Sequence, residues 1–227
     1  MTESQLFTKL VDVGALLAHE HQVHLQERIT EHTFQFDMTA GSIAFQGPAP
    51  FAARMQILGS AASEPGTWLW SWANPASQIP VQLTATSRML QQYGQQHEVP
   101  EFAEQELPLG EDTWQRLAVA SVMAAREPRT TFPAPAGNGT IVLTTLDSPE
   151  LELPRPSVTR TVRIISEAFA TIRIESHAAA VARYALDRGL EFDWRDGAPR
   201  ITLPDGHIDL EIDPDQDRIT KLSASGG

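Results

Sequence analysis

The sequence contains no cysteine. A chain without cysteine has no disulfide scaffold, no zinc site or iron–sulfur cluster held by thiolates, and no thiol nucleophile. It also lacks a run of about 20 apolar residues, the length that a membrane-spanning helix needs. The longest candidate, residues 6–17, is interrupted by Lys9 and Asp12. We therefore expect no thiol chemistry and no membrane partner.

Basic side chains are few, with 17 Lys and Arg against 29 Asp and Glu, for a formal net charge of −12. Nucleic-acid binding depends mainly on positive side chains that neutralise phosphates, so we expect no nucleic-acid partner. The start of the chain has Glu3 ahead of any lysine and no basic segment leading into an apolar one. This is unlike a secretory signal and predicts a cytoplasmic protein.

Motifs for the common catalytic chemistries are also missing. The sequence has no G-x-S-x-G nucleophile elbow, no P-loop, no G-x-G-x-x-G after a strand and no set of kinase motifs. We therefore expect no cofactor. At 41% hydrophobic and 20% charged residues, the composition is that of an ordinary globular protein. The length of 227 residues predicts one large domain or two small ones.

The N-terminal third predicts one long helix followed by a four-stranded meander. Apolar residues recur at helical spacing over residues 4–31, and alternation then follows around 34–36, 43–45, 51–60 and 67–73. We expect the helix to pack across the meander. Leu10, Val13 and Leu17 should then be largely buried, with Phe34 or Phe36 among their neighbours.

The rest of the chain repeats this coarse plan. We predict helices over residues 80–96, 112–127, 157–172 and 177–188, an acidic surface connection over 98–112, a hairpin over 129–147, and strands over 190–194, 200–203, 208–212 and 219–222. Asp112 and Gln115 have the spacing of a capping box, and Asp-Gly pairs predict tight hairpin turns. The expected fold class is α+β, with antiparallel meanders each preceded by helix and a helix–four-strand plan at both ends. We expect domains at residues 1–128 and 129–227, or one continuous domain.

Three tryptophans, Trp68, Trp70 and Trp72, alternate along the fourth predicted strand. In a strand they share one face, because side chains at i, i+2 and i+4 point the same way. They form either a core layer under the first helix or the wall of a ligand cavity.

The segment GTWLWSWANP resembles the signature of an uncharacterised, largely actinobacterial family with a domain of unknown function. Its members have a long N-terminal helix ahead of a W-x-W-x-W-A-N strand. They end in a short meander similar to DGHIDLEID here. The resemblance covers most of the chain in layout and is specific at residues 67–75. It implies no activity and no catalytic residue.

Polar residues interrupt the apolar arc of the first helix near its end, at His21, His24 and Arg28. They mark a helix end leaving the core, a polar pocket, or a metal site that lacks a third ligand. His19-Glu20-His21 is not the H-E-x-x-H motif, because position 23 is Val. Residues 213–217 resemble the start of a calcium loop but lack its later Gly and Glu, so they predict an exposed turn.

The sequence favours a non-catalytic binding protein, whose partner is an unknown small molecule or protein. A pocket between the first helix and the tryptophan strand would suit a carboxylate or phosphate head on an apolar body. Its candidate ligand-binding residues are Trp68, Trp70, Trp72, His21, His24 and Arg28. The alternatives are an enzyme with a site at His21 and His24, and an acidic immunity-like partner of a basic protein. If the pocket is absent, the acidic segment 98–112 is the next candidate for an interaction surface.

Overall fold

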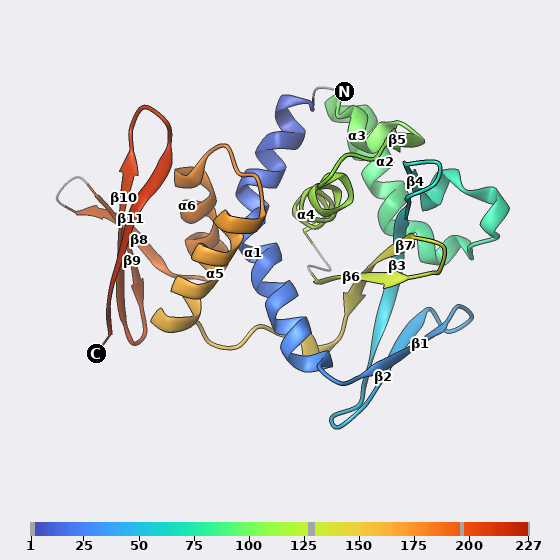
Figure 1. The fold of residues 1–227 in the computed structure, drawn as a ribbon, viewed down its shortest axis with the longest axis horizontal. Helices are drawn as coiled ribbons and strands as arrows, with labels where there is room; N and C mark the ends of the chain where they lie inside the picture. The colour runs from blue at the N-terminus through green and yellow to red at the C-terminus, as the bar shows by residue number, and fades with distance from the viewer. Residues whose placement is uncertain (1–2, 127–129, 196–197, 227) are drawn as a thin grey trace.

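The computed structural model describes residues 3–126, 130–195 and 198–226 (Figure 1). Its helices are α1 (Gln5–Ile29), η1 (Ser71–Ala73), η2 (Pro75–Ser77), η3 (Val81–Thr84), α2 (Ala85–His97), α3 (Pro100–Ala103), α4 (Thr113–Ala125), η4 (Pro149–Leu151), α5 (Val158–Thr171) and α6 (His177–Asp187), where η marks a 3₁₀ helix. Its strands are β1 (Thr33–Asp37), β2 (Ser42–Gln46), β3 (Phe51–Ala62), β4 (Thr67–Trp70), β5 (Glu106–Pro108), β6 (Thr130–Pro135), β7 (Thr140–Asp147), β8 (Glu191–Arg195), β9 (Ala198–Leu203), β10 (Gly206–Asp213) and β11 (Arg218–Gly226).

The strands form two antiparallel sheets. In the first, the order is β1-β2-β3-β4-β5, and β3 also pairs along its other edge with β7, which pairs with β6. The second is the meander β11-β10-β9-β8. Helices and antiparallel sheet at both ends of the chain confirm the predicted fold class. The hairpin β6–β7 adds its strands to the first sheet. The predicted division between residues 128 and 129 lies outside the described residues and stays a prediction.

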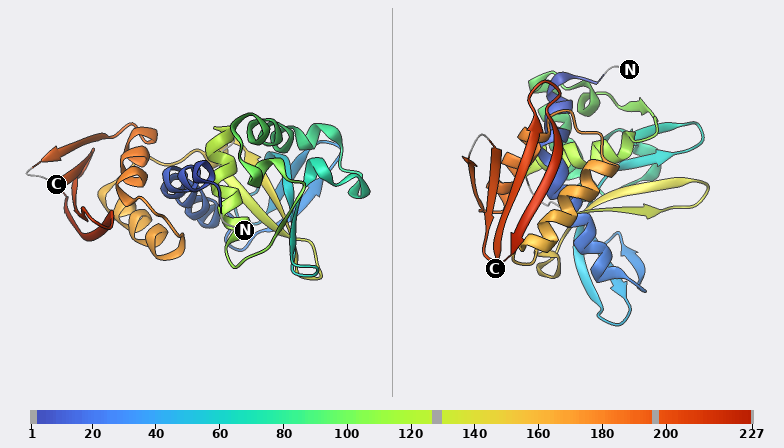
Figure 2. Two further views of the ribbon diagram at one scale, coloured as in Figure 1. Left: turned by 90° about the horizontal axis from the view of Figure 1, so that it is seen from above. Right: turned by 60° about the vertical axis from the view of Figure 1, so that its left-hand side comes forward.

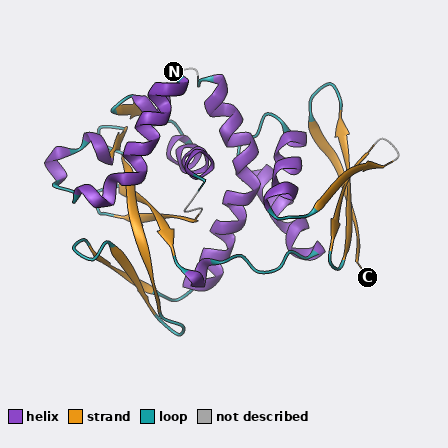
Figure 3. Cartoon of the chain, turned by 180° about the vertical axis from the view of Figure 1, so that it is seen from behind, coloured by secondary structure: helices purple, strands orange, loops and turns teal. Residues whose placement is uncertain are grey.

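Helix α1 lies between two parts of the molecule: α4 with the first sheet, and α5 and α6 with the second sheet (Figures 1 and 2). On one side it packs against α4, and on the other against α6 and α5, which cover one face of the second sheet. The close approach to α4 needs Gly14, where an added Cβ would lie only 3.1 Å from Met123 Cβ. Seen from behind, the same order of layers is clear (Figure 3).

The sequence predicts that α1 packs across the first meander, and this is wrong. In the structure α1 packs mainly against α4 and α6. Gly14 lets α1 approach α4 closely at Val119 and Met123, so α4 occupies the face assigned to the meander. Leu17 is buried as expected, whereas Leu10 and Val13 are half-buried. The half-buried Phe34 packs in a separate apolar cluster that contains Leu25, near the end of α1.

Three local predictions need correction. Strand β4 ends at Trp70, and the next three residues form η1, so the strand does not reach residue 73. The segment 98–112 is more than a surface connection, because it holds α3 and β5 with Val99, Phe102 and Leu107 buried. Asp112 precedes α4, but its side chain makes no capping hydrogen bond. The other predicted helices and strands are confirmed to within a few residues.

Among the described residues, helices cover one face of the second sheet. Alternate residues of β9 and β10, among them Ile201 and Ile208, are completely buried toward the helices. Some of the intervening residues are charged, and Arg200 forms a two-pronged ion pair with Asp209 on the neighbouring strand, at 2.5 and 2.8 Å. Among the described residues, no helix combines the length and the apolar character needed to cross a membrane.

Candidate functional site

The tryptophan strand β4 has one face in the core. The side chains of Trp68 and Trp70 are completely buried, and their rings meet edge to face with centroids 5.2 Å apart. Trp70 Nε1 donates a hydrogen bond to the carbonyl oxygen of Glu101 at 3.1 Å. Trp72 lies on η1 and is half-buried against the same cluster. On this side of the strand, Trp68 and Trp70 are part of the packed core.

The opposite face of the same strand borders a cavity of about 500 Å³, which we call the sheet cavity. Leu69, between the two buried tryptophans, lines it, as does Ser71 just after the strand. The complete lining is Phe34, Phe36, Met38, Ile57, Gly59, Ser60, Leu69, Ser71, Asn74, Ser77, Ile79, Ala134, Pro135, Ala136, Thr140, Val142 and Thr144. Strands β1, β3, β4, β6 and β7 therefore all contribute to one hollow.

Aromatic and aliphatic side chains form most of the wall of the sheet cavity. Phe34 and Phe36 stand on β1 with their rings 5.6 Å apart in an edge-to-face pair. Ile57 and Val142 come from the paired strands β3 and β7. No residue in its lining carries a charged side chain.

Several polar groups of the sheet cavity are held by hydrogen bonds within the protein. Ser71 Oγ donates to the carbonyl oxygen of Ile57 at 2.5 Å and lies 2.6 Å from Ser87 Oγ. Thr144 Oγ1 donates to a carbonyl oxygen of β6 at 3.1 Å. Asn74 Oδ1 accepts from the backbone N–H of Ser77 at 3.2 Å. The hydroxyl and amide groups are thus fixed in direction, as orienting groups in a ligand pocket need to be.

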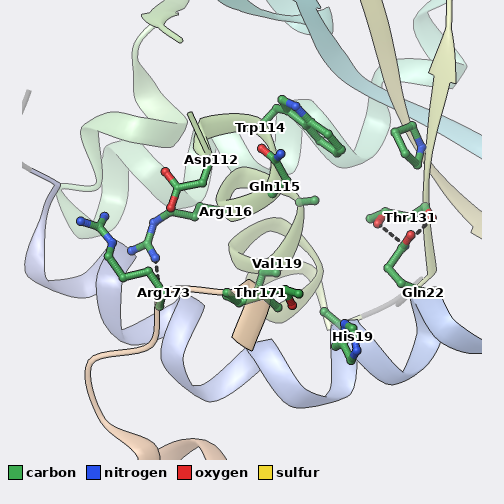
Figure 4. Close-up of a pocket in the computed structure, with 14 residues that line it drawn as sticks. His19, Gln22, Asp112, Trp114, Gln115, Arg116, Val119, Thr131, Thr171 and Arg173 are labelled. Carbon is green, nitrogen blue, oxygen red and sulfur yellow. Dashed lines mark hydrogen bonds between the residues drawn. The ribbon is translucent and has the colours of Figure 1, made fainter. Parts of the chain in front are cut away.

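A second cavity, of about 250 Å³, lies among helices and is called the helix cavity here (Figure 4). It is bounded by α1, α4, β6 and the end of α5. Its lining residues are Ala18, His19, Gln22, Asp112, Trp114, Gln115, Arg116, Ala118, Val119, Thr131, Pro133, Thr171, Ile172 and Arg173. Figure 4 shows Asp112, Arg116 and Arg173 toward one end, and Gln22 with Thr131 toward the other.

The polar residues predicted on α1 have partners of their own. His21 Nδ1 lies 3.0 Å from Thr130 Oγ1, and Arg28 pairs with Glu150 at 2.5 Å. Burial, with the charge of Arg160 as the next cause, lowers the pKa of His24 below its ordinary value.

The six predicted site residues lie outside the linings of the two cavities. None of Trp68, Trp70, Trp72, His21, His24 and Arg28 lines the sheet cavity or the helix cavity. Their role in binding a ligand stays a prediction. The sequence analysis missed Leu69 and Ser71, although strand alternation is a signal for them: if tryptophans at 68 and 70 face the core, residues 69 and 71 face the other way.

In the described part of the chain, no group of three or more His, Asp or Glu side chains is placed to hold a metal ion.

The predicted turn after β10 is confirmed, since Asp213 Oδ1 accepts hydrogen bonds from the backbone N–H groups of Asp215 and Gln216, at 2.9 and 3.0 Å.

A protein-family model matches residues 8–149, and its description is a family of unknown function, DUF6882. The chain belongs to this family. Searches of curated proteins and of solved structures found no match. Every residue that lines the sheet cavity falls inside the DUF6882 segment, whereas Thr171, Ile172 and Arg173 of the helix cavity fall outside it. The sheet cavity can therefore be formed from DUF6882 residues alone.

Proposed function

We propose that the protein is a non-catalytic binding protein that holds a small apolar molecule in the sheet cavity. The observation that carries the proposal is the cavity itself, of about 500 Å³ and walled largely by apolar side chains. Ligand pockets generally have volumes of about 300–1,000 Å³, apolar walls and a few fixed polar groups. Phe34 and Phe36 would contact one side of the ligand, while Ile57 and Val142 would contact the other.

The charge of the lining selects the kind of ligand. Burying a carboxylate or phosphate away from water is costly unless an opposite charge or several donors receive it. The lining of the sheet cavity includes Ser60, Asn74 and Thr140 but no cationic side chain. For this cavity we therefore propose an uncharged ligand, in place of the anionic head that suits the predicted pocket at His21 and His24.

The same lining argues for binding without catalysis. General acid–base catalysis needs a side chain that exchanges a proton near neutral pH, and nucleophilic catalysis needs an activated group. The hydroxyl groups of Ser71 and Thr144 donate to backbone carbonyl oxygens, and no histidine or carboxylate lines the sheet cavity. From the sequence we also propose that the protein is cytoplasmic and that its family is bacterial and shares the tryptophan motif.

The test uses the uncharged fluorescent probe N-phenyl-1-naphthylamine, whose emission rises in apolar surroundings. We expect saturable binding that the substitution Val142→Trp weakens by at least about tenfold, because the indole fills the hollow. Val81→Trp is the matched control, since Val81 is 65% exposed and does not line the cavity. Circular dichroism would verify that both variants are folded. Absence of saturable binding, or equal binding by Val142→Trp, would reject the proposal.

A further inference from the structure

The helix cavity joins the DUF6882 segment to the chain that follows it. Its walls come from α1 and α4 on one side and from Ile172 and Arg173, just after α5, on another. Ala18, Val119 and Ile172 give it an apolar surface, and the half-buried indole of Trp114 adds an aromatic one. This surface fits the compact apolar or aromatic body of a small ligand.

One carboxylate at this cavity has no side-chain partner among the residues that the structure describes. Asp112 stands at the start of α4, yet its side chain makes no capping hydrogen bond, and it forms no other hydrogen bond or ion pair with the described residues. Since Asp112 lines the cavity and is only half-buried, its oxygens are available as acceptors.

An amide at the opposite end also offers an oxygen. The side-chain nitrogen of Gln22 donates to the carbonyl oxygen of Thr131 at 2.6 Å and to its hydroxyl oxygen at 2.8 Å. Both amide hydrogens are therefore used, and the amide carbonyl oxygen is the polar atom that remains. Asp112 and Gln22 thus give each end of the helix cavity an oxygen acceptor.

The arginines of the cavity are mostly engaged elsewhere. Arg116 is almost completely buried and donates from Nε and Nη2 to the Glu3 carboxylate, at 2.7 and 2.6 Å. Its Nη1 donates to the carbonyl oxygen of Arg173 at 2.7 Å. Arg173 reaches the same Glu3 carboxylate at 3.2 Å, and Figure 4 shows its side chain directed away from Val119 and Thr171.

From these contacts we infer that the helix cavity is a second binding site, which takes a compact organic amine with an apolar or aromatic body. The ammonium group would donate to Asp112, and the body would lie against Trp114 and Val119. A charge-assisted hydrogen bond of this kind is stronger than a neutral one. The net charge of −12 adds a general attraction for cations.

The test compares three probes of nearly equal shape by isothermal titration calorimetry: 2-phenylethylamine, 2-phenylethanol and 3-phenylpropionate. The amine should bind at least about tenfold more tightly than the alcohol or the acid. Asp112→Asn should remove this preference. Folding should be kept because asparagine serves as well as aspartate before a helix. Asp215→Asn, in the exposed turn after β10, is the control that removes the same charge elsewhere and should bind like the parent protein.

Two further results separate this site from the sheet cavity. Val142→Trp should leave amine binding unchanged, and Asp112→Asn should leave binding of N-phenyl-1-naphthylamine unchanged. Tighter binding of 3-phenylpropionate would assign the site to anions through Arg173 and overturn the inference. Equal binding of all three probes, no binding of the amine, or an amine affinity that does not depend on Asp112 would overturn it as well.

Discussion

The hydroxyl group of Tyr184 on α6 donates a 2.8 Å hydrogen bond to the carboxylate of Glu20 on α1, and both side chains are buried. Arg160 and Arg188 complete the surroundings of this carboxylate, with nitrogen–oxygen distances of 3.2 and 3.0 Å. Burial and the neighbouring Glu20 charge raise the pKa of Tyr184 well above its ordinary value. The tyrosine therefore stays a donor, and the cluster ties α1 to α5 and α6.

Tyr184→Phe should lower the free energy of unfolding by about 1.5–3 kcal/mol, because the Glu20 carboxylate loses a charged hydrogen bond. Glu20→Gln should cost more, about 3–5 kcal/mol, since two arginines lose their buried partner charge. Urea denaturation would measure both. The control is Tyr93→Phe on α2, where a half-buried tyrosine loses its hydroxyl and a change below about 0.5 kcal/mol is expected. A Tyr184→Phe variant as stable as the parent would contradict the role assigned to this hydrogen bond.

Gly59 on β3 allows the tryptophan strand to pack against it. A Cβ at this position would lie 2.5 Å from the carbonyl oxygen of Leu69 and 2.5 Å from the Trp68 ring. Gly59→Ala should therefore destabilise the protein by about 1–3 kcal/mol, the usual cost of overfilling a packed core, as measured by denaturant unfolding. The near-ultraviolet circular dichroism of the tryptophans should change as well.

Gly110→Ala is the comparison for this substitution, because its Cβ would meet only the Thr113 hydroxyl, at 3.2 Å. It should cost clearly less than Gly59→Ala. If the two variants were equally stable, the contact between β3 and the Trp68 ring could not be as tight as described.

His24 predicts a pH dependence of stability. Burial lowers its pKa in the folded protein, and the charge of Arg160 adds to this, while Glu27 opposes it. As the pH falls below the ordinary value of 6.5, the unfolded chain takes up a proton that the folded protein resists. Stability is therefore lost on acidification and is present in full above that value.

His24→Gln should reduce the difference in unfolding free energy between about pH 7.5 and about pH 5, because glutamine does not titrate there. Urea denaturation at the two pH values would measure this. His97→Gln, at the exposed end of α2, is the control for the change of residue type. An unchanged pH dependence in His24→Gln would show that His24 is protonated as easily in the folded protein as in the unfolded one.

Much of the fold follows from local patterns. The helical period of α1 and the Asp-Gly turn between β9 and β10 depend on neighbouring residues, so their prediction needed no knowledge of tertiary contacts. Composition is misleading for the segment 98–112, because its many carboxylates predict an exposed connection. Val99, Phe102 and Leu107 are separated by polar residues, yet all three are buried in the main core. There Phe102 meets the rings of Phe7 and Trp70, which are distant in sequence.

The candidate sites depend still more on distant residues. The burial of Glu20 could not be foreseen, because Arg160 and Tyr184 lie 140 and 164 positions further along the chain. The sheet cavity likewise needs Phe34 of β1 and Val142 of β7 to line one hollow, which the order of the strands in the sheet brings about. Strand alternation predicts that Leu69 and Ser71 share a face, but it does not reveal whether that face is hollow or filled.

The position of α1 between the two parts has a consequence for the order in which the protein can form during synthesis. Helix α1 leaves the ribosome before α4 and long before α6, the helices that supply most of the side chains that cover it. The carboxylate of Asp12 accepts a hydrogen bond from the backbone N–H of Ser176, which lies 164 positions further along the chain, so this bond forms only after Ser176 has been synthesised. One apolar side of the first helix therefore stays uncovered until most of the chain has been translated, and during that interval it is a natural surface for a chaperone to hold.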